Sequence, residues 1–330
     1  MAAVYKSVRL ITWLIALLLF VAILTQLPFS SLSETVSRLE SAQWLLWILV
    51  NLLTILMLVI RWQILIRATG QKTGLVPLLL VRQAGQLVSF ITPGPQFGGE
   101  PLMVYWLWKN YRLPGSTALL VVGLDRFMEL WVNFAILFLA VLLLLVNTTV
   151  DAADWQGVAG VLAALVLLLS LSGVFLIRHP AKMSALLQRI STRWRHHPIL
   201  GKLDSEWNLI SQNLRELVGL HKMALVWALV FSLLGWAGMI IELWLLMSFF
   251  VPAPDFSGFI VLFVAMRLAF LLPLPGGIGT LEAAVYWAIH GWGLPASVAL
   301  GLIVLMRLRD AFIMLCALFA LRHLNRNEPP

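Results

Sequence analysis

Charged residues are scarce in this sequence of 330 residues. Asp, Glu, Lys and Arg together make up 12% of it, whereas apolar residues make up 61%. A soluble domain is about a quarter charged and about half apolar. With a mean hydropathy of +0.93, the composition excludes a water-soluble domain and predicts an integral membrane protein.

Several motifs are also missing, and each absence excludes a kind of chemistry. The single cysteine, Cys316, cannot form an intrachain disulfide. The chain has no G-x-x-x-x-G-K-[ST] phosphate loop, so we do not expect ATP to drive it directly. His and Cys residues do not cluster at ligand spacing, and neither a G-x-S-x-G elbow nor a D-x-D pair is present. We therefore expect no metal, no cofactor and no enzymatic activity.

The positive charge has a simpler explanation than nucleic-acid binding. The net charge is +8, but the basic residues flank apolar stretches. Such residues orient membrane spans, because cytoplasmic loops carry an excess of Lys and Arg. If the N-terminus is cytoplasmic, 16 basic residues lie inside and one, Arg38, lies outside. We predict cytoplasmic N- and C-termini and no nucleic-acid partner.

Six apolar stretches are long enough to cross about 30 Å of hydrocarbon as helices. They cover residues 10–27, 44–66, 116–146, 158–177, 223–250 and 296–321. Two further apolar regions, 76–111 and 256–292, each contain a Pro/Gly-rich break. Such breaks are tolerated at membrane depth only where protein or a watery cavity satisfies the freed backbone. The predicted fold is all-α: a polytopic integral membrane bundle of about six transmembrane helices plus two re-entrant helical hairpins, with pairs of short spans as the alternative to hairpins.

The two broken regions resemble each other. Pro93-Gly-Pro95-Gln-Phe-Gly-Gly-Glu100 in the first matches Pro273-Leu-Pro275-Gly-Gly-Ile-Gly-Thr-Leu-Glu282 in the second. Six later positions, ending at Arg126, recur 181 residues further on, ending at Arg307. Three spans separate the hairpins, so the second would enter the membrane from the opposite side. An inverted repeat of this kind brings its broken segments together near the midplane, where transporters bind their substrates.

We treat the chain, 1–330, as a single integral membrane domain with repeat 1 at about 76–146 and repeat 2 at about 256–321. An amphipathic loop at 178–222, predicted to be cytoplasmic, lies between them. Its apolar residues recur at helical spacing around 183–194 and 203–217. Two short helices lying on the inner leaflet would fit this pattern, and so would a helical pair packed on the bundle.

Charged residues inside the predicted spans are candidates for function, since a charge at the bilayer centre costs about 2.5–3.5 kcal/mol on insertion scales. The repeat places Arg126 and Arg307 at matching positions, and a guanidinium presents a planar fork that matches phosphate. Glu100 and Glu282 could accept a headgroup amine or a proton, or could cap the helix that follows each break. The predicted substrate-binding residues are Arg82, Pro93, Gly94, Gly98, Gly99, Glu100, Arg126, Pro273, Pro275, Gly276, Gly277, Gly279, Glu282 and Arg307.

Each of these features also has a structural interpretation. Arg126 with Glu129 and Arg307 with Asp310 are three residues apart, so each pair can form a buried salt bridge within one helix. We favour a structural role for the other charged residues that we single out at membrane depth, which are Asp125, Glu129, Glu242, Arg267 and Arg309. For the two repeat arginines we favour a functional role. Backbone amides left free at the breaks would be a second phosphate contact, and a simple hairpin turn is the alternative.

At these residues the sequence resembles the lysylphosphatidylglycerol synthase transmembrane region family of flippase-like membrane proteins. The resemblance is carried by Phe90–Glu100 with Arg126 and, more specifically, by Leu272–Glu282 with Gly293 and Arg307. It implies a multi-pass inner (plasma) membrane protein of a bacterium or archaeon that handles lipids. Members with a soluble aminoacyl-transferase domain make an aminoacylated phospholipid, which their membrane domain moves between leaflets. Because the chain ends soon after its last predicted helix, we expect no lipid synthesis here.

The sequence thus predicts a lipid translocase that moves an anionic or zwitterionic phosphate-containing headgroup along a polar groove between the hairpins. The expected partner is a membrane phospholipid or a polyprenyl-phosphate-linked lipid, and a homo-oligomer or a membrane partner protein is left open. One alternative is an intramembrane transferase that uses Glu100 or Glu282 as an acid or base on a lipid-linked substrate. The other is a non-transporting accessory membrane subunit, which the amphipathic loop suggests.

Overall fold

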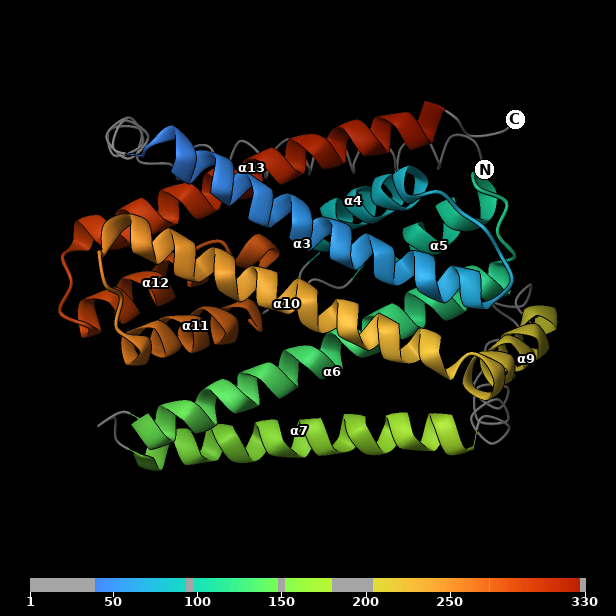
Figure 1. The fold of residues 1–330 in the computed structure, drawn as a ribbon, viewed down its shortest axis with the longest axis horizontal. Coiled ribbons are helices and arrows are strands. Elements are labelled where there is room, and N and C mark those ends of the chain that lie inside the picture. The colour runs from blue at the N-terminus through green and yellow to red at the C-terminus, as the bar shows by residue number, and fades with distance from the viewer. Residues whose placement is uncertain (1–38, 93–97, 148–151, 180–203, 273, 327–330) are drawn as a thin grey trace.

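A computed structural model describes residues 39–92, 98–147, 152–179, 204–272 and 274–326. Every regular element in these ranges is a helix (Figure 1). The predicted first span at 10–27 lies outside the described residues, as do Pro93, Gly94 and Pro273 among the predicted site residues. The first half of the amphipathic loop, 180–203, lies outside them as well.

Five long helices run along the bundle: α3 (Ser41–Ala68), α6 (Gly115–Asn147), α7 (Ala152–Arg178), α10 (Lys222–Phe250) and α13 (Ala296–Arg326). The first four are long and apolar enough to cross a membrane. α13 is equally long, but it carries Arg307, Arg309 and Asp310 near its middle. These helices coincide with five of the six predicted spans.

Each broken region forms two short helices that meet at the break. The first contains α4 (Leu75–Ile91) and α5 (Glu100–Lys109). The second contains α11 (Phe256–Phe270), the 3₁₀ turn η2 (Pro275–Gly277) and α12 (Thr280–Gly291). α4 has 17 residues and α11 has 15, fewer than the roughly 20 that a full crossing needs. Figure 1 shows α4 and α5 in one half of the bundle and α11 and α12 in the other, as expected of hairpins rather than of short spans.

The two repeats exchange packing partners. Within each repeat, the helix after the break packs on the long helix that follows it, α5 on α6 and α12 on α13. The helix before the break packs on the long helix of the other repeat, α4 on α13 and α11 on α6. The two hairpins and their long helices therefore form one packed unit.

α3 and α10 pack against each other in opposite directions across this interior (Figure 1). Two glycines of α10 allow the close approach. A Cβ at Gly238 would lie 2.2 Å from Thr54 Oγ1, and one at Gly235 would lie 2.7 Å from a methyl carbon of Leu58. At such distances a side chain would push the helices apart, so these two positions hold α3 against α10.

The second half of the amphipathic loop forms α9 (Asp204–Leu220). Ile210, Leu214 and Leu217 on its apolar face are buried against the bundle, where α9 contacts α6 and α10. Asn213 also donates a hydrogen bond to Thr117 of α6 at 3.4 Å. For this half of the loop, packing on the bundle is therefore the correct interpretation, because the apolar face is already covered by protein.

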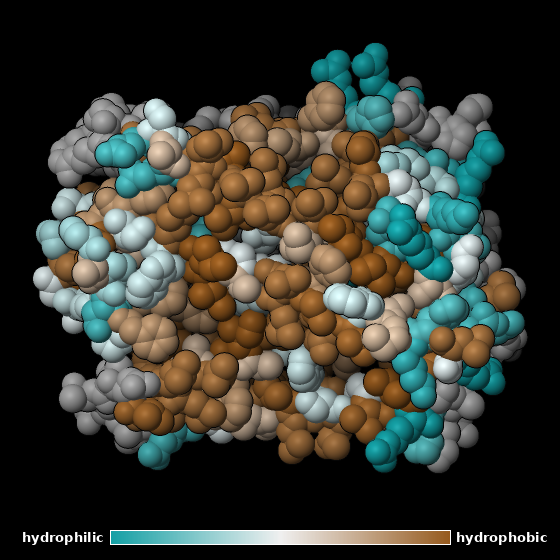
Figure 2. Space-filling model, in the orientation of Figure 1, coloured by the Kyte–Doolittle hydropathy of each residue, from teal (hydrophilic) through white to brown (hydrophobic). Residues whose placement is uncertain are grey.

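The outside of the bundle is apolar around its middle. Large apolar side chains are exposed along α3, α7, α10 and α13, among them Leu45, Leu168, Trp227 and Phe319. Figure 2 shows hydrophobic residues across the middle of the visible face and hydrophilic residues gathered toward its two ends. Such a belt matches the hydrocarbon layer of a bilayer. The protein is an all-helical, polytopic membrane bundle.

Candidate functional site

The second break packs against the end of the helix that precedes the first break. Gly276 in the second break has a φ of +59°, and a Cβ there would lie 2.2 Å from the ring of Phe90 at the end of α4. Only glycine tolerates both the backbone conformation and the close approach. In the first break, a Cβ at Gly99 would lie 2.0 Å from the carbonyl oxygen of Gly85. Glycine thus brings the break segments into contact with the helices around them.

At the first break, Arg126 of α6 reaches the start of α5. Its Nε lies 2.5 Å from Glu100 Oε1, and its Nη1 lies 3.2 Å from Glu129 Oε2 in the same helix as the arginine. The second oxygen of Glu100 accepts a hydrogen bond from the Gly98 amide at 2.7 Å. The carboxylate of Glu100 therefore joins the break, the start of α5 and the long helix of the repeat.

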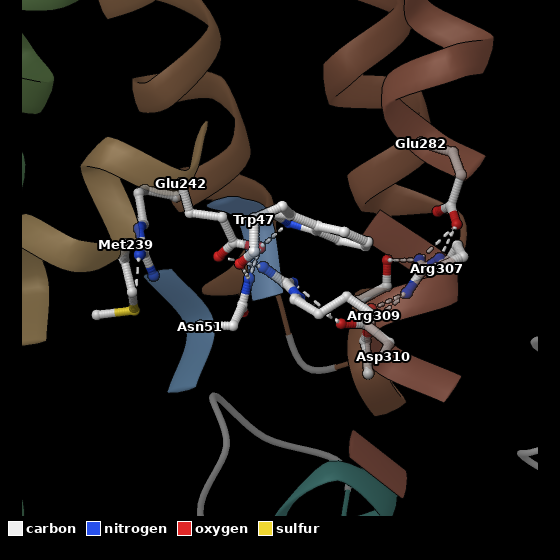
Figure 3. Close-up of polar contacts among 11 residues, drawn as sticks. Trp47, Asn51, Met239, Glu242, Glu282, Arg307, Arg309 and Asp310 are labelled. Atoms are coloured by element: carbon white, nitrogen blue, oxygen red, sulfur yellow. Dashed lines mark hydrogen bonds and ion pairs between the residues drawn. The ribbon is translucent and has the colours of Figure 1, made fainter. Parts of the chain in front are cut away.

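The second break repeats this arrangement with different residues (Figure 3). Arg307 Nε lies 2.5 Å from Glu282 Oε1, and its Nη1 lies 3.2 Å from Asp310 Oδ2. The second oxygen of Glu282 accepts a hydrogen bond from the Gly279 amide at 2.8 Å. We call these two arrangements the first and second arginine centres.

The geometry decides several of the sequence-based expectations. The predicted pairs of Arg126 with Glu129 and Arg307 with Asp310 are confirmed. The capping role is confirmed for Glu282, which accepts from the N-cap residue Gly279, whereas Glu100 accepts from Gly98, one residue before the N-cap of α5. The pairing of each arginine with the break glutamate of its own repeat was missed. A signal for it was present, because arginine and glutamate recur at nearly the same offset, 181 and 182 residues.

The expectation of free backbone amides at the breaks is wrong for four of the described glycines, Gly98, Gly99, Gly277 and Gly279. The amides of Gly98 and Gly279 donate to the break glutamates, the Gly99 amide donates to Ser89 Oγ at 3.0 Å, and the Gly277 amide donates to a backbone carbonyl. The breaks are tight turns whose donors are used within the protein, because a bare amide away from water is costly.

The two centres differ in how firmly they are held. Nη1 of Arg307 also lies 3.3 Å from the carbonyl oxygen of Gly276, and Nη2 lies 3.4 Å from that of Gly277. All three nitrogens of this guanidinium therefore have acceptors within its own repeat, and the side chain is 1% exposed. Arg126 is 17% exposed. Arg307 fixes the shape of its break, whereas Arg126 is the more accessible of the pair.

Further charges extend the first centre. Asp125 forms ion pairs with Arg61 and with Arg82, the latter at 3.3 Å. Arg61 also lies 3.7 Å from Glu129 and donates to Ser232 of α10. The predicted site residue Arg82 thus joins the site through Asp125 and not at the break. We call the six charged residues together the first polar cluster: Arg61, Arg82, Glu100, Asp125, Arg126 and Glu129.

A second chain of contacts leads away from the second centre (Figure 3). Arg309 lies 3.0 Å from Asp310 Oδ1 and 2.9 Å from Glu242 Oε2 of α10. Glu242 also accepts hydrogen bonds from Trp47 and Asn51 of α3. The second polar cluster comprises Trp47, Asn51, Glu242, Glu282, Arg307, Arg309 and Asp310. In the part of the chain that the structure describes, no group of three or more His, Cys, Asp or Glu side chains is arranged to hold a metal ion.

These features define a class of protein: a polytopic membrane bundle that keeps two related charged sites at the broken helices of an internal repeat. The chain belongs to the lysylphosphatidylglycerol synthase transmembrane region family, whose model matches residues 8–317. It is 25% identical to a UPF0104 membrane protein of Methanothermobacter thermautotrophicus over 295 residues, which is 84% of this chain and 83% of that one. It is 22% identical to a UPF0104 membrane protein of Methanocaldococcus jannaschii over 303 residues, 89% and 88% of the two chains. No solved structure matches the chain significantly.

Proposed function

We propose that this protein moves lipids with a phosphate-containing headgroup between the two leaflets of the membrane. The observation that carries the proposal is the pair of equivalent arginine centres, one at each break, inside a bundle whose exterior is apolar. Buried charges are costly in a membrane, and they mark substrate paths more often than they add stability. Two such centres of the same design suit a ligand that passes from one to the other.

The arrangement of the hairpins supports an inverted repeat. The helices α4 and α5 lie toward one end of the bundle and α11 and α12 toward the other (Figure 1), and the two repeats exchange packing partners. Transporters built from inverted repeats bind their substrates where the broken helices meet. We propose that the headgroup travels along this junction while its acyl chains remain in the surrounding lipid.

The exchange at each centre follows from charge. Arg126 and Arg307 each bind a glutamate carboxylate, and a phosphate oxygen can replace a carboxylate oxygen on the same guanidinium fork. Glu100 or Glu282, once displaced, would accept a proton or a headgroup amine. In this proposal the glutamates compete with the substrate for the arginines, and the headgroup moves without any covalent step.

Reconstitution into vesicles tests the function. We expect the purified protein to speed the movement of fluorescently labelled phosphatidylglycerol between leaflets, measured as loss of fluorescence when dithionite reaches the outer leaflet. A labelled glycosyl diacylglycerol, which lacks phosphate, should move no faster than in protein-free vesicles. Equal rates for phosphatidylglycerol with and without protein would contradict the proposal.

We also propose that the end of the bundle with Lys72, Lys109 and Arg322 faces the cytoplasm of a bacterial or archaeal inner membrane, because positive residues are retained there. In a Cys316→Ser background, a membrane-impermeant thiol reagent added to intact cells should label Asp255→Cys and not Lys72→Cys. Labelling of Lys72→Cys from outside would reverse the orientation. Asp255 and Lys72 are both exposed, so burial does not shield either site from the reagent.

A further inference from the structure

Arg267 differs from the other arginines at membrane depth. It lies in the last turn of α11, directly before the second break. Among the described residues, no carboxylate lies within the 4.0 Å of an ion pair from it. Each of the other five, Arg61, Arg82, Arg126, Arg307 and Arg309, has at least one such carboxylate. The salt bridge expected for Arg267 from the sequence is therefore not formed.

Aromatic rings hold this guanidinium in place of a carboxylate. Its central carbon lies 4.2 Å from the centroid of Trp236 and 5.6 Å from that of Phe263. A ring face attracts a cation without using its N–H groups. The one hydrogen bond to a described residue goes from Nη2 to the sulfur of Met239 at 3.6 Å, and a thioether is a weak acceptor. The residue as a whole is only partly buried.

Arg267 lies close to the second polar cluster in the fold, because its hydrogen-bond partner Met239 is three residues before Glu242 in α10. The first cluster has three arginines and three carboxylates, and the second has two arginines and three carboxylates. Arg267 thus balances the total charge from a distance, while its strong donors are left for another acceptor.

We infer that Arg267 is a phosphate-binding residue, which receives the phosphate group of a lipid headgroup at the second break before either arginine centre opens. The inference rests on the proposed function for the source of its ligand. An anion at Arg126 or Arg307 must displace a carboxylate, whereas an anion at Arg267 displaces only a thioether. Its place directly before the second break lies on the path proposed for the headgroup.

Binding to the purified, delipidated protein in a phosphate-free detergent tests the inference. The probes are dioctanoyl phosphatidylglycerol and, separately, inorganic phosphate, and the measured quantity is the dissociation constant. We expect Arg267→Met and Arg267→Lys to weaken binding at least about tenfold, since the first removes the cation and the second removes the fork. The matched control is Arg322→Met, which removes an exposed cation at the basic end of the bundle and should stay within about twofold of the unsubstituted protein.

The outcomes separate the sources of phosphate. Arg267-dependent binding of the short-chain lipid alone identifies a headgroup site, and dependence for inorganic phosphate as well identifies a site for the phosphate group in general. If Arg267→Met does not fold, the affinity of Arg267→Lys tests the inference instead, because lysine keeps the positive charge at this position. Affinity within about twofold of the unsubstituted protein in the folded variants, or no binding by the unsubstituted protein, overturns the inference. Lipid movement in vesicles is scored separately, so Arg267-dependent binding without movement would contradict only the proposed function.

Discussion

Replacing Asp125 by Asn is expected to destabilise the protein by about 3–5 kcal/mol, the usual cost of leaving a buried charge without its partner. Asp125 pairs with both Arg61 and Arg82, which are 0% and 4% exposed. Without its charge, Arg82 has no carboxylate within ion-pair distance among the described residues. The free energy of unfolding, measured by titrating the micellar protein with SDS, would show the loss.

Asp310→Asn is the matched control. Asp310 also lies between two arginines, but Arg307 keeps Glu282 and Arg309 keeps Glu242, so we expect a smaller loss of about 1–3 kcal/mol. A second test is the double variant Asp125→Asn with Arg82→Met, which restores the charge balance. It should be more stable than Asp125→Asn alone. Equal effects of the two asparagine variants would show that Asp125 is not the main counter-charge of the first cluster.

Arg126→Lys is expected to lower lipid movement about tenfold or more while the protein still folds. Lysine keeps the positive charge beside Glu100 and Glu129, so the ion pairs can persist, but it cannot present two parallel N–H donors to one phosphate. Loss of one charge-assisted hydrogen bond of about 1.5 kcal/mol corresponds to roughly a tenfold change. The rate of headgroup movement in vesicles and the melting temperature of the protein are measured on the same preparation.

The structure changes what is expected of Arg307→Lys. This guanidinium also binds the carbonyl oxygens of Gly276 and Gly277, which a lysine ammonium cannot reach together with Glu282 and Asp310. The variant should therefore lose stability, about 1–3 kcal/mol for unsatisfied buried acceptors, as well as movement. Arg126→Lys is therefore the cleaner test of phosphate recognition. If a folded Arg126→Lys protein moved lipid normally, the role of Arg126 would be structural only.

If both arginines act on one headgroup along one path, the double lysine variant should move lipid at about the rate of the worse single variant and no better. Independent roles would instead multiply the two losses. A folded Arg322→Lys protein is the control, because Arg322 is exposed at the basic end of the bundle and has no expected role in recognition.

The site was only partly predictable from the sequence. The internal repeat showed that Arg126 in the first half corresponds to Arg307 in the second. Helical spacing predicted the pairs of Arg126 with Glu129 and of Arg307 with Asp310. The pairing of Asp125 with Arg61 and Arg82 joins three different helices, α3, α4 and α6, and no local pattern connects them. The sequence assigned Arg267 to a salt bridge, yet in the fold its neighbours are aromatic rings.

The sequence alone determined the membrane class of the protein, the described long helices and the positions of both breaks. Hydrophobic length and Pro/Gly interruptions are local properties, and the bilayer acts on them directly. Only the tertiary structure decided that each arginine binds the glutamate of its own break, that the break amides are occupied, and that α9 packs on the bundle. These features depend on which helices become neighbours, since a charge in the membrane interior pairs with an opposite charge that helix packing places close to it.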